Sequence, residues 1–249
     1  METRIPKNSA VLSALLQADF TTIWRNRRSM RLVLIVPLLI LISWKGLIDK
    51  IGGVFVLSSC ITIGLTSIGL MGYTNAIARD RDKGVFQRLR VGPVSAWTIM
   101  ISRLAVQVVM ILLMTVLVFL VGYYVDHISI SPLGYVTGLL MAMVGGVVYL
   151  GLGQAIVGRI KNPDTASSTT RLVYFAFIMI GMFGEFGALG KEMAQIVIWS
   201  PYGVVRKILG ASLSPATWEL KTTYALLAAI GYTILFVILG VKWFKWDSK

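Results

Sequence analysis

The sequence predicts an all-α integral membrane protein with six transmembrane helices in a single domain, residues 1–249. Hydrophobic residues make up 56% of the chain and charged residues only 14%, whereas soluble globular domains carry roughly 25% charged residues. The mean hydropathy is +0.78. Residues 51–78 and 104–125 contain no Asp, Glu, Lys or Arg, and apolar runs of about 20 residues are typical of membrane-spanning helices. A chain of this length leaves no room for a separate soluble catalytic domain.

The first element is an amphipathic helix at residues 9–31, which is too polar to span a membrane. Its apolar residues recur at helical spacing, and polar residues take the other side. We expect it to lie in the cytoplasmic membrane interface, with a basic cluster near anionic headgroups. A soluble helix packed on a partner is the alternative. The apolar residues are Leu12, Leu15, Leu16, Phe20, Ile23 and Trp24, and the cluster is Arg25, Arg27, Arg28 and Arg31.

Six apolar segments follow, and glycines within them favour close helix packing. Gly134 and Gly138 form one GxxxG pair, a spacing associated with helix contacts in membranes. The second cytoplasmic loop, residues 159–171, contains the turn Asn162-Pro163-Asp164, where Asp164 or Thr165 is the candidate cap of the next helix. The predicted spans are about 32–48, within 51–78, 104–125, within 132–158, about 172–189 and 222–241.

Between the second and third spans lies a charged stretch, residues 79–103, with six Lys/Arg and two Asp. Val85, Phe86 and Leu89 form a small apolar patch at helical spacing, so we expect a short amphipathic helix there. Gly92-Pro93 would end it, because proline disfavours helix in the preceding residue. The stretch is either a segment that another protein moves or a solvated basic loop that only fixes topology.

The distribution of basic residues predicts the topology. Eighteen Lys/Arg lie in the terminal segments and the two loops assigned to the cytoplasm, and six lie in the outer segments. This bias places both termini inside and requires an even number of spans. A net charge of +13 is also typical of nucleic-acid-binding proteins, but these charges follow the span boundaries, so we expect membrane lipids and no nucleic acid as partners.

Residues 190–221 remain apolar before the last span but are interrupted by Pro201. Apolar-patterned segments of ten to fourteen residues favour an interfacial or re-entrant element over a full span. We therefore predict an outer re-entrant hairpin here.

Few side chains in the chain can do chemistry. Glu185 is the one carboxylate expected at membrane depth, where it would line a transport pathway or contact a cationic substrate; the alternative is an outer-edge residue that reaches water or pairs with Lys191. His127 and Cys60 are the only residues of their kinds, so we expect no metal site. The glycine-rich stretch at residues 184–191 does not have phosphate-loop spacing, so no cofactor is expected in this chain.

The stretch at residues 80–93 resembles the first cytoplasmic loop of ABC-2 type permeases, the membrane subunits of a class of ABC exporters. That loop typically reads E-R-E-R-G-T-L-E-x-L-x-V-T-P-L, and here Val85, Gln87 and Gly92 depart from it. In the family the loop docks on the ATPase subunit, so the resemblance implies a coupling segment at residues 79–97. Its candidate coupling residues are Asp80, Arg81, Asp82, Lys83, Gly84, Phe86, Gln87, Arg88, Leu89, Arg90 and Pro93.

The resemblance also covers the amphipathic helix before the first span and Ser200-Pro201-Tyr202 in the outer hairpin. It implies a type V exporter in a bacterial or archaeal cell membrane, with two copies of this chain, or one copy and a paralogue, and two ABC ATPase subunits that hold ATP and Mg. The cargo would be a drug, a peptide or a lipid-like molecule. The alternatives are an ATP-independent secondary transporter and, less favoured, a membrane-embedded enzyme.

Overall fold

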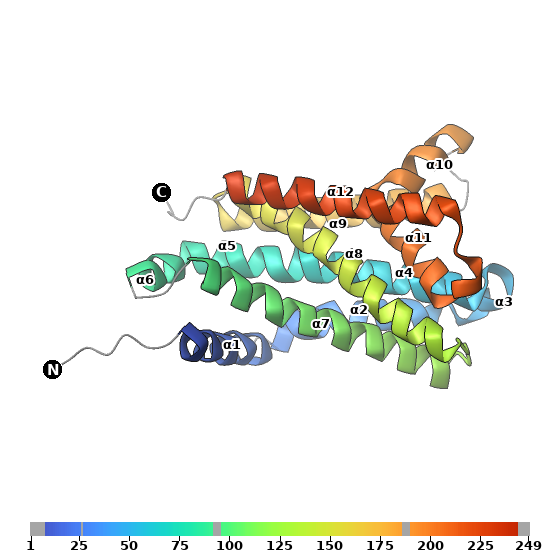
Figure 1. Ribbon diagram of the computed structural model, residues 1–249, viewed down its shortest axis with the longest axis horizontal. Helices are drawn as coiled ribbons and strands as arrows, with labels where there is room; N and C mark the ends of the chain where they lie inside the picture. The colour runs from blue at the N-terminus through green and yellow to red at the C-terminus, as the bar shows by residue number, and fades with distance from the viewer. Residues whose placement is uncertain (1–7, 26, 92–95, 186–189, 244–249) are drawn as a thin grey trace.

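The computed structural model describes residues 8–25, 27–91, 96–185 and 190–243 and forms a bundle of helices that run roughly along one axis (Figure 1). Within these residues all regular structure is helical. The long helices are α7 (Ala96–Tyr124), α8 (Pro132–Arg159), α9 (Pro163–Glu185) and α12 (Leu220–Trp243). A further long helix is continuous through α4 (Gly53–Thr66), the π-helical segment η2 (Ser67–Thr74) and α5 (Asn75–Asp82).

Shorter helices connect and cap the bundle. At the start of the chain are α1 (Asn8–Arg25) and α2 (Arg27–Ser43), followed by the 3-10 turn η1 (Lys45–Leu47) and α3 (Ile48–Ile51). The middle holds α6 (Val85–Val91), and the segment before α12 holds α10 (Gly190–Trp199), α11 (Pro201–Leu213) and the turn η3 (Pro215–Thr217).

Five helices are long and apolar enough to cross a membrane, and they match the second to sixth predicted spans. They are Gly53–Asp82, Thr98–Tyr124, Pro132–Arg159, Pro163–Gly184 and Leu220–Trp243. The predicted first span overlaps α2, but the apolar part of α2, Val33–Ser43, is shorter than the five helices that can cross a membrane. A membrane crossing by α2 therefore stays a prediction.

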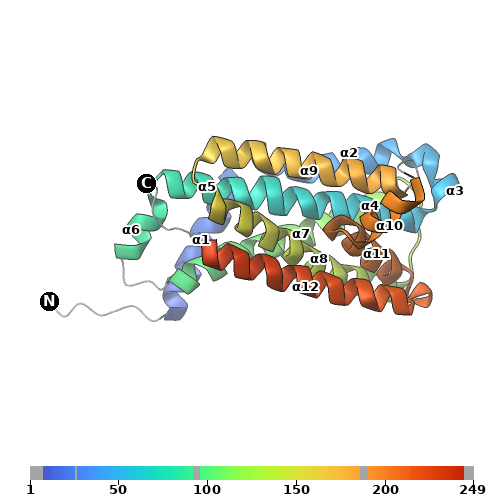
Figure 2. The same ribbon diagram turned by 90° about the horizontal axis from the view of Figure 1, so that it is seen from above.

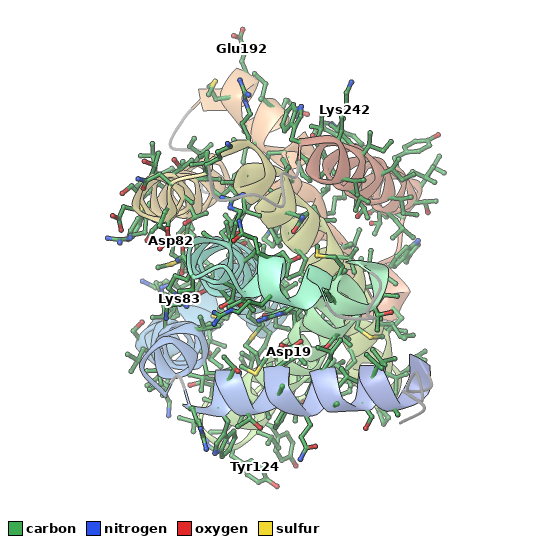
Figure 3. All side chains as sticks on the ribbon, turned by 90° about the vertical axis from the view of Figure 1, so that its left-hand side faces the viewer. Asp19, Asp82, Lys83, Tyr124, Glu192 and Lys242 are labelled. Atoms are coloured by element: carbon green, nitrogen blue, oxygen red, sulfur yellow. The ribbon has the colours of Figure 1, made fainter. Side chains whose placement is uncertain are left out.

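The sequence indicated one amphipathic helix at residues 9–31, but the structure divides this segment between two helices. α1 ends at Arg25 and a second helix begins at Arg27, so the later arginines of the basic cluster belong to α2. Seen from the end of the bundle, α1 runs crosswise to the long helices (Figure 3). Phe20 and Trp24 are exposed on it. A crosswise helix with exposed aromatic side chains has the geometry expected of an interfacial helix.

The α4–η2–α5 helix occupies the middle of the bundle, whereas α9 and α12 lie along opposite edges (Figure 2). In its most apolar window, 83% of Gly53–Asp82 is buried, against 17% for Leu220–Trp243. Hydroxyls in this buried helix bond to its own backbone: Thr62 donates to the Ser58 carbonyl at 2.7 Å, and Thr66 donates to the Thr62 carbonyl at 2.7 Å. Such bonds allow polar residues at a depth where water is absent.

The central helix comes close to α8 at two glycines, Gly69 on η2 and Gly153 on α8. A Cβ on Gly69 would lie 2.6 Å from the backbone carbon of Tyr149, and a Cβ on Gly153 would lie 2.5 Å from the Gly69 carbonyl oxygen. Nearby, the buried Tyr73 hydroxyl donates to Gln154 Oε1 at 2.8 Å. Close backbone approach and one internal polar pair therefore join the two helices.

Gly134 and Gly138, the predicted GxxxG pair, have the same use at the other end of α8. A Cβ on Gly134 would lie close to the Leu213 carbonyl oxygen, and a Cβ on Gly138 would lie 2.7 Å from Leu213 Cδ2. The missing side chains of this pair let α11 pack closely against α8, which confirms the predicted packing role.

The region before the last helix is broken into α10 and α11 at Ser200. The Ser200 hydroxyl accepts a hydrogen bond from the Gly203 amide at 3.2 Å, and Pro201 occupies the first helical position, which is a common start for a helix. α11 packs against α4, α8 and α12, and both short helices lie toward the end of the bundle opposite α6 (Figure 1). This broken pair is the structural counterpart of the predicted outer hairpin, whose re-entry into a membrane stays a prediction.

The second loop is shorter than predicted, because α9 begins at Pro163 rather than near residue 172. Its cap is Asn162, and the prediction of Asp164 or Thr165 was wrong. Asn162 Oδ1 accepts hydrogen bonds from the Asp164 amide at 2.8 Å and the Thr165 amide at 3.0 Å. Those two residues supply the amides because they already belong to the first turn.

The glycine crossing predicts a specific sensitivity. Gly153→Ala should lower the free energy of unfolding by about 1–3 kcal/mol, since the new Cβ meets backbone atoms that no rotamer change can move. Thermal unfolding of the full chain in detergent measures this. Gly231→Ala is the matched control, because it makes the same change on α12 where nothing lies within 4 Å. Equal midpoints for the two variants would refute the proposed close approach.

Candidate coupling site

The predicted coupling segment begins at the end of the central helix. α5 ends at Asp82, and Gly84 follows with φ +65°, a left-handed conformation that glycine adopts without strain. The Gly84 amide donates to the Arg81 carbonyl at 3.0 Å, and the Arg88 amide donates to the Gly84 carbonyl at 3.1 Å. The chain then forms α6, which confirms the predicted short helix. The predicted stop at Gly92-Pro93 lies outside the described residues.

Four of the candidate coupling residues present exposed side chains: Asp82, Lys83, Gln87 and Arg88. Arg88 Nη2 donates to the Lys83 carbonyl at 2.9 Å, so its side chain folds back over the α5–α6 turn. Asp82 and Lys83 lie at the end of the bundle that faces the viewer in Figure 3. The side chains of Leu89 and Arg90, and all of Pro93, lie outside the described part of the structure.

Phe86 and Arg81, in contrast, are only 1% exposed. Phe86 belongs to the main apolar core and ties α6 to the bundle. The sequence pattern placed both residues with the docking residues, but burial leaves them no surface for a partner chain. Their role in this structure is to position the exposed residues beside them.

Arg81 closes the end of α8. Its Nη1 donates to the Val157 carbonyl at 2.7 Å, and its Nη2 donates to the carbonyls of Ile160 and Lys161, the latter at 2.9 Å. The last carbonyls of a helix have no partner within the helix, and a cation is favourable there. The guanidinium fork satisfies several of them at once. Arg81 consequently fixes the end of α5 to the start of the second loop.

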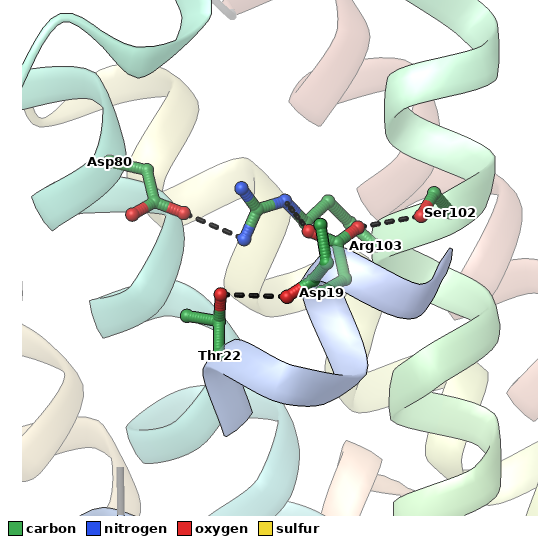
Figure 4. A network of polar contacts seen from close by, with 6 residues as sticks. Asp19, Thr22, Asp80, Ser102 and Arg103 are labelled. Carbon is green, nitrogen blue, oxygen red and sulfur yellow. Dashed lines mark hydrogen bonds and ion pairs between the residues drawn. The ribbon is translucent and has the colours of Figure 1, made fainter. Parts of the chain in front are cut away.

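A second network joins three helices through Arg103 on α7 (Figure 4). Arg103 Nη1 lies 2.7 Å from Asp80 Oδ2 on α5, and Arg103 Nε lies 3.2 Å from Asp19 Oδ1 on α1. The Ser102 hydroxyl donates to the other oxygen of Asp19 at 2.6 Å. The three charged side chains of this network are 10–19% exposed. The crosswise helix α1 is thereby held to the same helix end that carries the coupling segment.

Burial dominates the electrostatics of Asp19. Loss of hydration raises the pKa of this carboxyl above its ordinary value, and the charge of Asp80 adds to the rise. The Ser102 hydroxyl and the Arg103 guanidinium oppose it but do not cancel it.

Sequence reasoning missed the Asp19–Arg103 connection. Arg103 was included only as the last residue of the charged stretch, and Asp19 was not singled out. A signal existed, since Asp19 is the one acidic residue between Glu2 and Asp49 and falls within a basic, amphipathic segment. An isolated acid in such a segment indicates a specific basic partner.

The other predicted site residues have different outcomes. The side chain of Glu185 lies outside the described part of the structure, so its pathway role stays a prediction. Cys60 is buried in α4 as a small residue of the apolar core. Among the described residues, no group of three or more His, Cys, Asp or Glu side chains could hold a metal ion.

Comparison with known proteins decides the family. The model of the family described as ABC-2 type transporter matches residues 10–202, from α1 into the start of α11. This chain belongs to the ABC-2 type transporter family. It is also 23% identical, over 189 residues, to "Putative transport permease YvfS" of Bacillus subtilis (strain 168). That match covers 74% of this chain and 69% of the relative. The chain is thus a multi-pass membrane protein and a transport permease.

The capping contact of Arg81 can be tested in this permease. Arg81→Met should lower the free energy of unfolding by about 2–4 kcal/mol, because it leaves several carbonyls at the end of α8 without a donor. SDS titration of the detergent-solubilised chain measures this. Arg159→Gln, at an exposed arginine near the same helix end, should change stability by less than about 0.5 kcal/mol. A similar small effect of Arg81→Met would contradict the capping role.

The Arg103 network predicts a pH-dependent defect. Arg103→Gln should cost about 2–4 kcal/mol at neutral pH, because two partly buried carboxylates lose their shared cation. The pKa of Asp19 would then rise further above its unfolded value. As the pH falls through that raised pKa, the folded state takes up the proton first, so the free energy of unfolding of the variant recovers.

Thermal midpoints between pH 7 and about pH 4 follow this recovery. Lys242→Gln, an exposed change on α12, serves as the control and should show no such recovery. A deficit that stays constant or grows with acidification would rule out Asp19 as the affected group.

Proposed function

We propose that this permease is the transmembrane subunit of an ATP-driven exporter and that a separate ABC ATPase docks on the α5–α6 turn. Membership of the ABC-2 family supports the association with an ABC ATPase in general. The observation that carries the docking site is the combination of an exposed charged surface with a fixed base. Asp82, Lys83, Gln87 and Arg88 are exposed, while Arg81 directly beneath them is bonded to the end of α8.

The end of the bundle that carries α6 is the cytoplasmic end in this proposal. α1, α6 and the C-terminal end of α12 all lie there (Figure 1). Eighteen of the 24 Lys and Arg residues fall in the sequence segments 1–31, 79–103, 159–171 and 242–249. Cytoplasmic segments of membrane proteins carry such an excess of Lys and Arg. Both termini of the chain would then face the cytoplasm of a bacterial or archaeal cell.

A force on α6 has a continuous route into the bundle. Phe86 is packed into the core, Arg81 contacts the end of α8, and Asp80 contacts Arg103 on α7. Movement of the turn would therefore shift α5, α7 and α8 together and carry α1 with them. Rigid elements joined in this way can switch between two packed arrangements rather than deform gradually.

The assembly in this proposal contains two permease chains, either identical or paralogous, and two ATPase subunits. ATP and magnesium would be bound on the ATPases, because this chain carries no phosphate-loop sequence. The exported cargo would be a drug, a peptide or a lipid-like molecule. Cycles of ATP binding and hydrolysis would alternate the permease between inward-closed and outward-open states.

Charge reversal tests the docking surface. The double variant Lys83→Glu/Arg88→Glu should reduce recovery of an ABC ATPase with the affinity-purified permease by about tenfold, which corresponds to about 1.4 kcal/mol of binding free energy. Quantitative mass spectrometry of permease purified from its native membranes measures the recovery. Lys242→Glu is the control, since Lys242 is also exposed and basic but lies away from Lys83 (Figure 3).

The comparison requires that both variants insert into the membrane to the same extent as the unaltered chain. If the double variant recovered as much ATPase as the Lys242→Glu control, the ATPase would have to dock elsewhere. If no ABC ATPase were recovered even with the unaltered chain, ATP-driven transport itself would be refuted.

A further inference from the structure

The turn that joins α7 to α8, residues 125–131, lies at the end of the bundle opposite α6 (Figure 1). The Asp126 amide donates to the Val121 carbonyl at 3.4 Å, and the Ile128 amide donates to the Gly122 carbonyl at 2.8 Å. Between them, His127 has φ +54°, and among the described residues no other residue except glycine has a positive φ. A residue with a side chain adopts this conformation at a cost in free energy. The contacts around the turn must therefore hold it in this shape.

Two contacts fix the turn to other parts of the bundle. Ile128 is buried against the start of α4, where a Cβ on Gly53 would lie 2.7 Å from Ile128 Cγ2. Lys45 of η1 donates from Nζ to the Val125 carbonyl at 2.9 Å. The turn thus closes one end of the bundle by joining η1, α4, α7 and α8.

Asp126 is the residue of this turn that its contacts do not explain. It is only 8% exposed, and neither carboxyl oxygen accepts a hydrogen bond from the described residues. The Lys45 ammonium binds the carbonyl next to it instead. Burial of an ionised carboxylate is costly unless the group is paired and hydrogen-bonded. The closed turn consequently tolerates the protonated acid better than the carboxylate.

Few charges face this carboxyl. Loss of hydration raises the pKa of Asp126 above its ordinary value, and the charges of Lys45 on η1 and His127 in the turn oppose the rise but do not cancel it. On α4, the titratable group within range of its charge is the thiol of Cys60. The apolar stretches of α4, α7 and α8 add no other charge, because residues 51–78, 104–125 and 132–158 contain no Asp, Glu, Lys or Arg.

We propose that Asp126 is a proton-sensitive switch, protonated in the closed turn seen here and ionised when the turn opens. On opening, the proton passes from the carboxyl oxygen to bulk water, so no other reactant is needed. The carboxylate then reaches water and the Lys45 ammonium, which gives up its bond to the Val125 carbonyl. Opening also releases His127 from its left-handed conformation. The closed and open turns therefore differ by one bound proton.

The sign of the pH dependence follows from this difference. The proton stabilises the closed turn fully below the ordinary carboxyl pKa, and the stabilisation is lost as the pH rises through the raised pKa of Asp126 in the closed turn. An ionised Asp126 that held the turn closed by pairing would give the opposite sign, because acid would then open it. If the end opposite α6 faces the exterior, the switch responds to external pH. That last step alone rests on the orientation proposed above.

Hydrogen–deuterium exchange of the full chain in nanodiscs, without any ATPase, tests the switch. Mass spectrometry of peptides that span residues 121–131 gives the protection of the turn, after correction for the chemical exchange rate at each pH. Between about pH 4.5 and about pH 7.5, protection should fall by at least about threefold, and by no more than about tenfold per pH unit, the limit for one proton. Peptides that span η3, at the same end of the bundle, should show no such change (Figure 1).

Three variants separate the charge of Asp126 from its size. Asp126→Asn imitates the protonated acid, so its turn should stay protected over the whole range and exceed the unaltered chain by at least about threefold at about pH 7.5. Asp49→Asn, at an exposed carboxylate on α3, should behave as the unaltered chain does. Lys45→Gln removes a charge that favours the carboxylate, so the midpoint of the change should move to higher pH. This exposed position decides the question if Asp126→Asn does not insert.

Three outcomes would overturn the proposal. One is a protection of residues 121–131 that stays constant or rises with pH in the unaltered chain. Another is a turn that is less protected in Asp126→Asn than in the unaltered chain at neutral pH, because the carboxylate would then hold the turn closed. The third is a midpoint that moves to lower pH in Lys45→Gln. None of these measurements involves an ATPase, so the switch and the proposed exporter can fail separately.

Discussion

The buried guanidinium of Arg81 is the contact on which the end of this permease that carries α6 depends. A cation is costly to remove from water, and it is stable here because backbone carbonyls at the end of α8 and the start of the second loop accept its hydrogen bonds. Those carbonyls would otherwise lack hydrogen-bond partners. The guanidinium therefore satisfies the carbonyls, and the carbonyls stabilise the buried cation. The consequence is geometric: the end of α5, the end of α8 and the beginning of the loop before α9 form one unit, and the exposed turn at Lys83 is built on it.

The sequence predicted five long apolar helices and the short helix after α5, because both depend on local patterns. Apolar runs and their charged ends locate membrane helices, and Val85 and Phe86 mark the buried side of α6. It could not predict which charge in the run from Arg79 to Asp82 is buried. Successive helical residues point about 100° apart, so these four side chains face four directions, and only the position of α8 decides that Arg81 faces inward.

Other differences have the same origin in tertiary contacts. The π-helical segment η2 lies where Gly69 meets Gly153 of α8, and neither glycine indicates by itself that the helix widens there. In the sequence, Asp19 is one polar residue among several in an amphipathic helix, and only the packing of α7 brings Arg103 next to it. The cap of α9 was misassigned because Asn162, Asp164 and Thr165 are all good capping residues. The choice depends on the position of Lys161, whose carbonyl accepts a hydrogen bond from Arg81 directly before Asn162.

Helix α5 has a different neighbour at each of three successive residues. Arg79 lines a groove between α2 and α9, Asp80 contacts Arg103, and Arg81 contacts the end of α8, so three successive residues of α5 serve three different neighbours. A rotation or shift of α5 driven from the α5–α6 turn cannot preserve all three contacts at once. The contact to the groove is the one that can yield, because Arg79 is exposed while Arg81 is buried and hydrogen-bonded.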